Sequence, residues 1–157
     1  MFINFEKEPS QDTIEQIAKI AEDYTRDFFT DNIPEDTRRD LQFQRAVYLK
    51  DDCEIISFIV FTCWDGSPHI TLMATKRNHL RRGCAKMLME FFVEHVSSLG
   101  FNSIELLTVL PQTNPVYYST IAFYEKLGFI IEKEFPCLWE TGAIKLKKTW
   151  SDEHEIL

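Results

Sequence analysis

The stretch Arg81-Arg82-Gly83-Cys84-Ala85 joins two segments of different hydrophobic period. Residues 70–75 before it form a short apolar run typical of a strand, and the residues from Ala85 onward repeat apolar side chains at helical spacing. A small-residue turn that opens a helix leaves backbone N–H groups without an intrahelical partner, and such groups bind phosphate. The two arginines add charge at the positive end of the helix dipole. The pattern predicts either a pyrophosphate site or an ordinary strand-to-helix turn.

Length and composition indicate one globular domain. A chain of 157 residues can bury about two thirds of its unfolded surface around one core. The 45% hydrophobic and 13% aromatic content is typical of a packed protein rather than of a disordered one. We expect a single domain over residues 1–149, followed by an acidic, flexible tail over residues 150–157.

Charge and cysteine usage narrow the choice of partners. The formal net charge of −8 argues against a nucleic-acid binder, because the protein would repel a phosphate backbone. The four cysteines, at positions 53, 63, 84 and 137, lack the spacing of a zinc site or a disulfide framework, so no metal is expected. There is no apolar run of about 18 residues and no hydrophobic signal core near Met1, so we expect a cytoplasmic protein without a membrane partner.

Hydrophobic periodicity predicts seven strands and four helices. A helix opens near Asp12 and keeps its apolar spacing from Ile14 to Phe28, and Asp65-Gly66-Ser67-Pro68 forms a turn. Helices alternate with strands only in the middle of the chain, which favours an α/β (α+β) fold with a mixed, mostly antiparallel sheet. The predicted strands are residues 1–6, 45–49, 55–63, 70–75, 103–110, 129–135 and 143–148, and the remaining helices are residues 34–41, 85–99 and 115–127.

Two motifs together resemble one family. The turn at Gly83 resembles the acyl-CoA pyrophosphate loop of the GNAT superfamily of N-acetyltransferases, and Ala122-Phe123-Tyr124-Glu125-Lys126-Leu127-Gly128-Phe129 resembles that superfamily's downstream signature. The order of the predicted elements is also similar along nearly the whole chain. The resemblance implies the GNAT acyl-CoA N-acyltransferase fold, with about seven strands flanked by four helices. Phe28-Phe29, Pro115-Val116-Tyr117-Tyr118 and Cys137-Leu138-Trp139 look like a subgroup of uncharacterised bacterial members, which fixes no substrate.

The resemblance implies acetyl-CoA as the cosubstrate and assigns residues to it. The backbone of Met73, Ala74 and Thr75 would diverge from the next strand and bind the pantetheine and the thioester oxygen. The pyrophosphate would be held by Arg81, Arg82, Gly83, Cys84, Ala85 and Lys86. Leu80 stands where the family usually has Gln or Arg, so Arg81 or Arg82 would supply that charge. Tyr117 stands where the family often has Asn, which removes one usual coenzyme contact.

The catalytic groups are assigned in the same way. Tyr124 would protonate the leaving thiolate as general acid, or would only pack in the core. Residues 70–75 contain no carboxylate, although some family members have a catalytic Glu there. The candidates for a general base are Tyr117, Tyr118, His69, Glu105 or a bound water. We expect His69 to be a solvated loop residue beside the turn and Glu105 to face outward from its strand.

The acceptor is expected at the first two helices and the loop between them. Phe28, Phe29 and Asp31 are the candidate contacts, and acidic residues around aromatic ones suit a cationic amine. A solvated acidic helix face is the alternative. The sequence therefore predicts transfer of an acetyl group to a primary amine of a small molecule or peptide, by direct attack in a ternary complex of a monomer or homodimer. An acyl-CoA-binding sensor or subunit with little transferase activity is the second possibility, and another α/β nucleotide binder is disfavoured because a Walker lysine is absent.

Overall fold

The structure is a computed structural model that describes residues 1–25 and 27–151. The acidic tail predicted at residues 150–157 lies outside the described residues from position 152 onward. None of the helices in the described part is long and apolar enough to cross a membrane.

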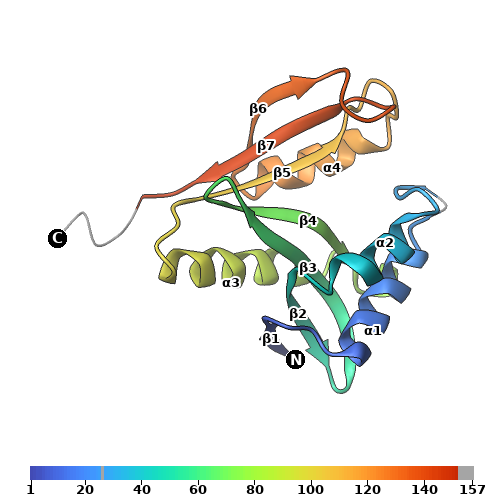
Figure 1. The fold of residues 1–157 in the computed structure, drawn as a ribbon, viewed down its shortest axis with the longest axis vertical. Coiled ribbons are helices and arrows are strands. Elements are labelled where there is room, and N and C mark those ends of the chain that lie inside the picture. The colour runs from blue at the N-terminus through green and yellow to red at the C-terminus, as the bar shows by residue number, and fades with distance from the viewer. Residues whose placement is uncertain (26, 152–157) are drawn as a thin grey trace. The chain divides into compact units, whose positions relative to one another are not determined.

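Seven strands form one open, mixed sheet, and four α-helices accompany them, as the sequence predicts (Figure 1). Hydrogen-bonded neighbours follow the order β1-β2-β3-β4-β5-β7-β6. The strands are β1 (Phe2–Glu6), β2 (Arg45–Asp51), β3 (Glu54–Trp64), β4 (Ser67–Thr75), β5 (Ser103–Val109), β6 (Ile130–Phe135) and β7 (Ala143–Thr149). The helices are α1 (Gln11–Glu22), α2 (Ile33–Asp40), α3 (Cys84–Ser98) and α4 (Tyr117–Lys126), with a short 3₁₀ turn, η1 (Arg77–His79), before α3.

The contacts divide the chain into two compact units. The N-terminal unit comprises Met1–Thr62 and Thr71–Phe92, and the C-terminal unit comprises Cys63–Ile70 and Val93–Leu157. The strands β3 and β4 and the helix α3 each contribute residues to both units. Each unit is described by itself below, and the single domain over residues 1–149 stays a prediction.

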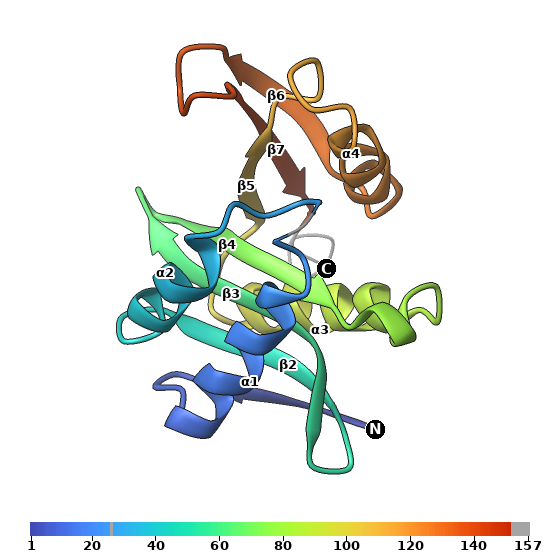
Figure 2. The same ribbon diagram turned by 90° about the vertical axis from the view of Figure 1, so that its right-hand side faces the viewer.

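The N-terminal unit has a core on each face of its strands. β1, β2 and β3 pair in antiparallel register, with Phe5 opposite Val47 and Val47 opposite Ile59. Successive residues of a strand point to opposite faces. Ala46 and Tyr48 accordingly pack with the apolar side of α1, while Leu49 packs with Cys84 at the start of α3. Figure 2 shows α1 and α2 on one face of these strands and α3 on the other.

Helix α1 is capped differently from the sequence prediction, and it is shorter. The hydroxyl of Ser10, not the carboxylate of Asp12, accepts a hydrogen bond from the N–H of Thr13. The helix ends at Glu22, although the apolar spacing continues to Phe28. The chain then turns back, because the N–H groups of Phe28 and Phe29 both donate to the carbonyl of Tyr24.

The C-terminal unit contains β5, β6, β7 and α4, together with the first part of β4 and the last part of α3. β5 pairs with β7 and β7 pairs with β6, and both pairings are antiparallel. His69 and Ile70 of β4 pair in parallel with Glu105 and Leu106 of β5. Figure 1 shows α4 lying along β5 and β7, and the inner face of that helix carries Tyr117, Ile121 and Tyr124.

The core of the N-terminal unit yields a stability prediction. Phe58 is fully buried in the cluster that packs beneath α1, so Phe58→Ala should lower the free energy of unfolding by about 3–5 kcal/mol through lost burial and a residual cavity. Phe43→Ala is the matched control, because that side chain is 91% exposed and its truncation should change the value by less than about 0.5 kcal/mol. Urea unfolding measures both, and equal effects would contradict the assigned core.

Candidate active site

The turn between β4 and α3 is built by two residues with left-handed backbone. Arg81 has φ of 63° and Gly83 has φ of 77°. This region is costly for a residue with a Cβ and free for glycine. A Cβ placed on Gly83 would meet no atom within 4 Å, so the glycine is needed for its backbone angle and not for space. The chain thereby reverses from η1 into α3 over the residues that the sequence singles out.

The first amides of α3 precede the helical hydrogen bonds. The N–H of Met87 donates to the carbonyl of Gly83, which places the amides of Cys84, Ala85 and Lys86 in the first turn, where no earlier helical carbonyl exists. The buried side chain of Cys84 packs against Leu49 and Ile56 and anchors this end of the helix on the core. An anchored helix N-terminus with three such amides can hold an anion.

Exposed cations surround the helix start. Arg81, Arg82 and Lys86 are all exposed, and within the described residues no hydrogen bond or ion pair occupies their side chains. Two neighbouring cations are already engaged, because Lys76 pairs with Glu54 at 2.5 Å and Arg77 pairs with Asp27 at 2.8 Å. The charges available to a bound anion are thus the ones predicted for the pyrophosphate.

Side-chain hydroxyl groups bind the backbone carbonyls at the end of β4. The hydroxyl of Tyr24 donates a hydrogen bond to the carbonyl of Thr75. The hydroxyl of Ser57 lies 2.8 Å from the hydroxyl of Thr75 and 3.4 Å from the carbonyl of Ala74. Met73 and Ala74 are half-buried. β4 and β5 belong to different units beyond Ile70 and Leu106, so their predicted divergence stays a prediction.

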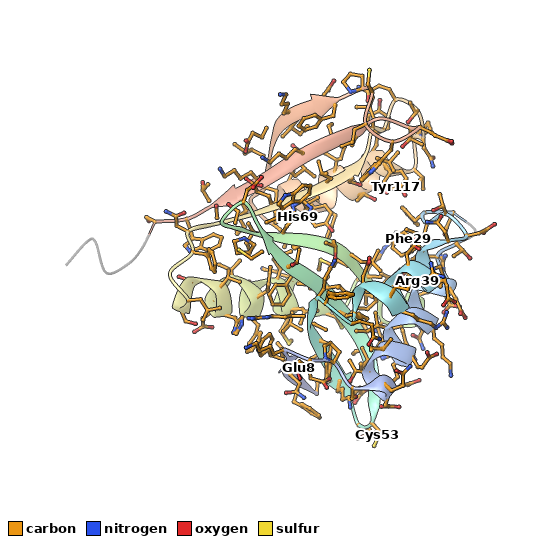
Figure 3. The ribbon with its side chains drawn as sticks, viewed as in Figure 1. Glu8, Phe29, Arg39, Cys53, His69 and Tyr117 are labelled. Atoms are coloured by element: carbon orange, nitrogen blue, oxygen red, sulfur yellow. The ribbon has the colours of Figure 1, made fainter. Side chains whose placement is uncertain are left out.

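Two of the three predicted acceptor contacts, Phe28 and Phe29, pack against the core cluster of the N-terminal unit. Figure 3 labels Phe29 in the segment between α1 and α2. Phe28 and Phe29 are half-buried, and their ring centroids lie 6.0 and 5.8 Å from that of Tyr24. Asp31 is exposed. The aromatic candidates are therefore partly core residues that keep some solvent exposure.

Arginine side chains of the protein itself pair with several acidic residues of this region. Asp27 pairs with Arg77, Glu35 pairs with Arg38 at 3.3 Å, and Asp36 pairs with Arg39 at 3.8 Å. A cationic acceptor would meet less negative charge here than the sequence alone indicates.

Tyr124 occupies an aromatic environment in the C-terminal unit. Its side chain is 8% exposed, and its ring makes edge contacts with Phe129 at 5.3 Å and Phe123 at 5.2 Å between centroids. Burial raises the pKa of Tyr124 well above its ordinary value, so the phenol stays protonated at neutral pH. None of the hydrogen bonds among the described residues engages its hydroxyl. The protonated phenol can donate a hydrogen bond, and the raised pKa makes it a weaker acid than an exposed tyrosine.

The candidates for a general base all lie in the C-terminal unit as well. Tyr117 is buried on the same face of α4 as Tyr124, whereas Tyr118 is exposed. The carboxylate of Glu105 lies 3.3 Å from the ammonium of Lys145 and 3.8 Å from that of Lys147. Glu105 is half-buried and alternates along β5 with the buried Ile104 and Leu106, so it lies on the other face of the strand, where both lysines engage its carboxylate.

The prediction that His69 is a solvated loop residue is wrong. Asp65 and Gly66 alone form the turn, with φ of 50° and 79°, and β4 begins at Ser67. His69 therefore lies within the strand and is 9% exposed, and its ring contacts that of Trp64 at 5.4 Å between centroids. Burial lowers the pKa of His69, and the nearby Glu105 carboxylate opposes that shift.

The structure also shows residues that the sequence reading missed. Tyr24, Ser57 and Arg77 hold the end of β4 and the segment after α1, although the sequence pattern marks Tyr24 only as an apolar helix position. Among the described residues, no group of three or more His, Cys, Asp or Glu side chains could hold a metal ion.

Comparison with known protein families identifies the chain. The family described as "Acetyltransferase (GNAT) domain" matches residues 43–131, which is more than half of the chain. The protein belongs to the GNAT family of acetyltransferases. The match includes β4, the Gly83 turn, α3 and α4, and it thus covers both motifs that carry the resemblance. No curated protein matches the sequence.

Solved structures confirm the GNAT fold. A protein from Desulfovibrio desulfuricans assigned to the GNAT family has a TM-score of 0.81 at 15% identity, and the match covers 94% of this chain and 99% of that one. An aminoglycoside 6'-N-acetyltransferase solved with coenzyme A has a TM-score of 0.74 at 18% identity, with 95% and 97% covered. The ribosomal-protein-S18-alanine N-acetyltransferase from Escherichia coli has a TM-score of 0.71 at 16% identity, with 96% and 95% covered.

Buried His69 yields a pH-dependent prediction for this GNAT protein. Because its pKa is lowered in the folded state, the unfolded chain binds the proton more tightly, and stability is lost as the pH falls through about 6.5. Urea unfolding should therefore show a smaller free energy at pH 5.5 than at pH 7.5. His69→Gln should reduce that difference, because Gln carries no proton to bind. The same pH dependence in both proteins would exclude His69 as its source.

Proposed function

We propose that this protein transfers an acetyl group from acetyl-CoA to a primary amine of a small molecule or peptide. The observation that carries the proposal is the anchored start of α3, where the amides of Cys84, Ala85 and Lys86 follow two left-handed residues and exposed cations surround them. This arrangement suits the pyrophosphate of coenzyme A. Membership of the GNAT family supports acetyl-CoA as the donor, as does the coenzyme A complex of the similar aminoglycoside acetyltransferase.

The reaction we propose is direct attack in a ternary complex. The neutral amine nitrogen forms a bond to the acetyl carbon, and the carbon–sulfur bond then breaks. The nitrogen loses its proton to water or to a nearby base, and the sulfur gains a proton from Tyr124, which is reprotonated from solvent. Backbone N–H groups of Met73, Ala74 or Thr75 would stabilise the negative charge on the carbonyl oxygen. The hydrogen bonds of Tyr24 and Ser57 to the carbonyls of this stretch support that role, because they fix its backbone.

The acceptor is proposed only as a class. The similar structures include an enzyme for aminoglycosides and one for a protein alanine, so a small-molecule amine and a peptide amine are both consistent with the fold. Phe28, Phe29 and Asp31 remain the proposed acceptor contacts. The exposed parts of the two half-buried rings could contact the apolar part of an acceptor, and the Asp31 carboxylate could pair with its ammonium.

The ion pairs of Glu105 support a second candidate function. Its carboxylate is engaged by Lys145 and Lys147, and β4 carries no carboxylate between Ile70 and Thr75, so no described side chain is an evident base. A GNAT domain of this kind could bind acyl-CoA as a sensor or subunit and transfer slowly. The two candidates differ in turnover and not in coenzyme binding.

The experiment combines coenzyme binding with turnover. Calorimetry measures acetyl-CoA binding, and release of free thiol measures transfer to a panel of amines, polyamines, amino acids and peptides. We expect binding together with amine-dependent thiol release. Gly83→Glu should abolish both, because the new carboxylate would repel the pyrophosphate and a Cβ is strained at this backbone angle, while the open surroundings keep the protein folded.

Gly66→Glu is the matched control for that variant. Gly66 has nearly the same backbone angle, with φ of 79°, and equally open surroundings, but it lies in the turn between β3 and β4. Unchanged affinity in Gly83→Glu would refute the coenzyme loop. Binding without thiol release from any amine would favour the sensor.

Tyr124→Phe tests the proposed acid. Loss of the hydroxyl should lower kcat by about 100-fold or more with little change in the KM for acetyl-CoA, because the proton is needed mainly in the transition state. Tyr48→Phe is the control, because it removes a hydroxyl that donates to Glu6 in the N-terminal unit and should leave kcat unchanged. Normal turnover in the first variant would remove Tyr124 from the mechanism.

A further inference from the structure

One side chain of the N-terminal unit touches both the proposed coenzyme strand and the proposed acceptor segment. Tyr24 is buried just beyond the end of α1, and its hydroxyl donates to the carbonyl of Thr75. Its own carbonyl accepts the N–H groups of Phe28 at 3.0 Å and Phe29 at 2.8 Å. Its ring makes an edge contact with the ring of Phe28 and a tilted contact with that of Phe29. A shift of Thr75 would therefore be transmitted to the segment that carries Phe28 and Phe29.

Arg77 ties the same two regions together from the other side. Its guanidinium lies over the Tyr24 ring, 4.3 Å from the centroid. It donates to both carboxylate oxygens of Asp27, at 2.8 and 3.1 Å, and to the carbonyl of Asp23 at 2.7 Å. Asp23 is the C-cap of α1, so the cation also satisfies a carbonyl at the negative end of that helix. Arg77 itself opens η1, which leads directly into the coenzyme loop.

The Asp27–Arg77 ion pair fits a role in positioning residues better than a role in stabilising the fold. Both side chains of the Asp27–Arg77 pair are more than a third exposed, and pairs of this kind add little to global stability. The arginine nevertheless makes a bidentate contact and a stacked contact, which fix orientation better than a single charge can. The Arg77 hydrogen bonds also lower the pKa of Asp27, so the pair is intact at neutral pH.

We infer that Tyr24, Asp27 and Arg77 are positioning residues that couple coenzyme binding at residues 73–86 to the ordering of residues 27–33, where the acceptor is proposed to bind. The inference rests on the proposed function, because it takes both sites from it. Binding of the coenzyme fixes the end of β4 and the start of η1, and the three side chains transmit that order to the acceptor segment. By linkage, an acceptor that orders residues 27–33 strengthens coenzyme binding by the same factor.

Amide hydrogen exchange on the full chain tests the coupling with coenzyme A as the probe. In the wild type, we expect coenzyme A to slow exchange at residues 73–86 and also, by about threefold to tenfold, at residues 27–33. Asp27→Asn should keep the protection at residues 73–86 and lose it at residues 27–33. Tyr24→Phe keeps the ring beneath the guanidinium but loses the hydrogen bond to Thr75, and it should also lose the distant protection.

Glu54→Gln is the matched control. It breaks the ion pair of Lys76, the residue next to Arg77, but Glu54 lies at the start of β3 and makes no contact with the acceptor segment among the described interactions. The control should behave as the wild type does. A role in folding alone would lower stability without changing the response to coenzyme A, so that result in Asp27→Asn and Tyr24→Phe would refute the coupling.

The outcomes separate this inference from the proposed function. Protection at residues 73–86 without protection at residues 27–33 in the wild type would refute the coupling and leave the coenzyme site standing. Absence of protection at residues 73–86 would refute the coenzyme site, and the coupling with it. Equal loss in Glu54→Gln and Asp27→Asn would reduce the effect to general electrostatics and would also overturn the inference.

Discussion

The backbone reversal at Arg81 and Gly83 is the constraint on which the proposed site depends. Both residues adopt left-handed angles, and this path brings the chain out of η1 and into α3, whose first amides have no helical partner. The burial of Cys84 then fixes the helix end against β2 and β3. A family-wide motif is thus produced here by one glycine, one strained arginine and one buried thiol.

Electrostatics make this turn distinct within an acidic protein. The chain carries a net charge of −8, yet the turn and the first residues of α3 contain five arginine and lysine side chains from Lys76 to Lys86. Two of them stabilise the protein's own carboxylates, and the other three are exposed. The internal pairs hold the turn, and the exposed cations are available to an anionic ligand. An acidic protein with one such basic turn suits a small anion better than a nucleic acid.

Local patterns in the sequence predict most of the fold. They miss features that depend on contacts between residues far apart in the sequence. The apolar spacing around Ile17 predicts α1, but the helix ends at Glu22, where its C-cap Asp23 accepts a hydrogen bond from Arg77, 54 residues away. The sequence predicts a four-residue turn before His69, but Asp65-Gly66 is a dipeptide that favours a two-residue hairpin turn, so His69 lies within β4. The turn proposed to bind the coenzyme is recognisable in the sequence because its signal is a local glycine. The role of Tyr24 was missed because its partner Thr75 is 51 residues away.

The central claim is that coenzyme A binds at the start of α3 and along the end of β4, and backbone amide chemical shifts test it most directly. In a titration of isotopically labelled protein with acetyl-CoA, we expect the largest shifts at the amides of Gly83, Cys84, Ala85 and Lys86, together with shifts at Met73 to Thr75. The Cys84 to Lys86 amides should move because they would donate to the pyrophosphate. Saturable binding that leaves these amides unmoved and shifts another region would contradict the account.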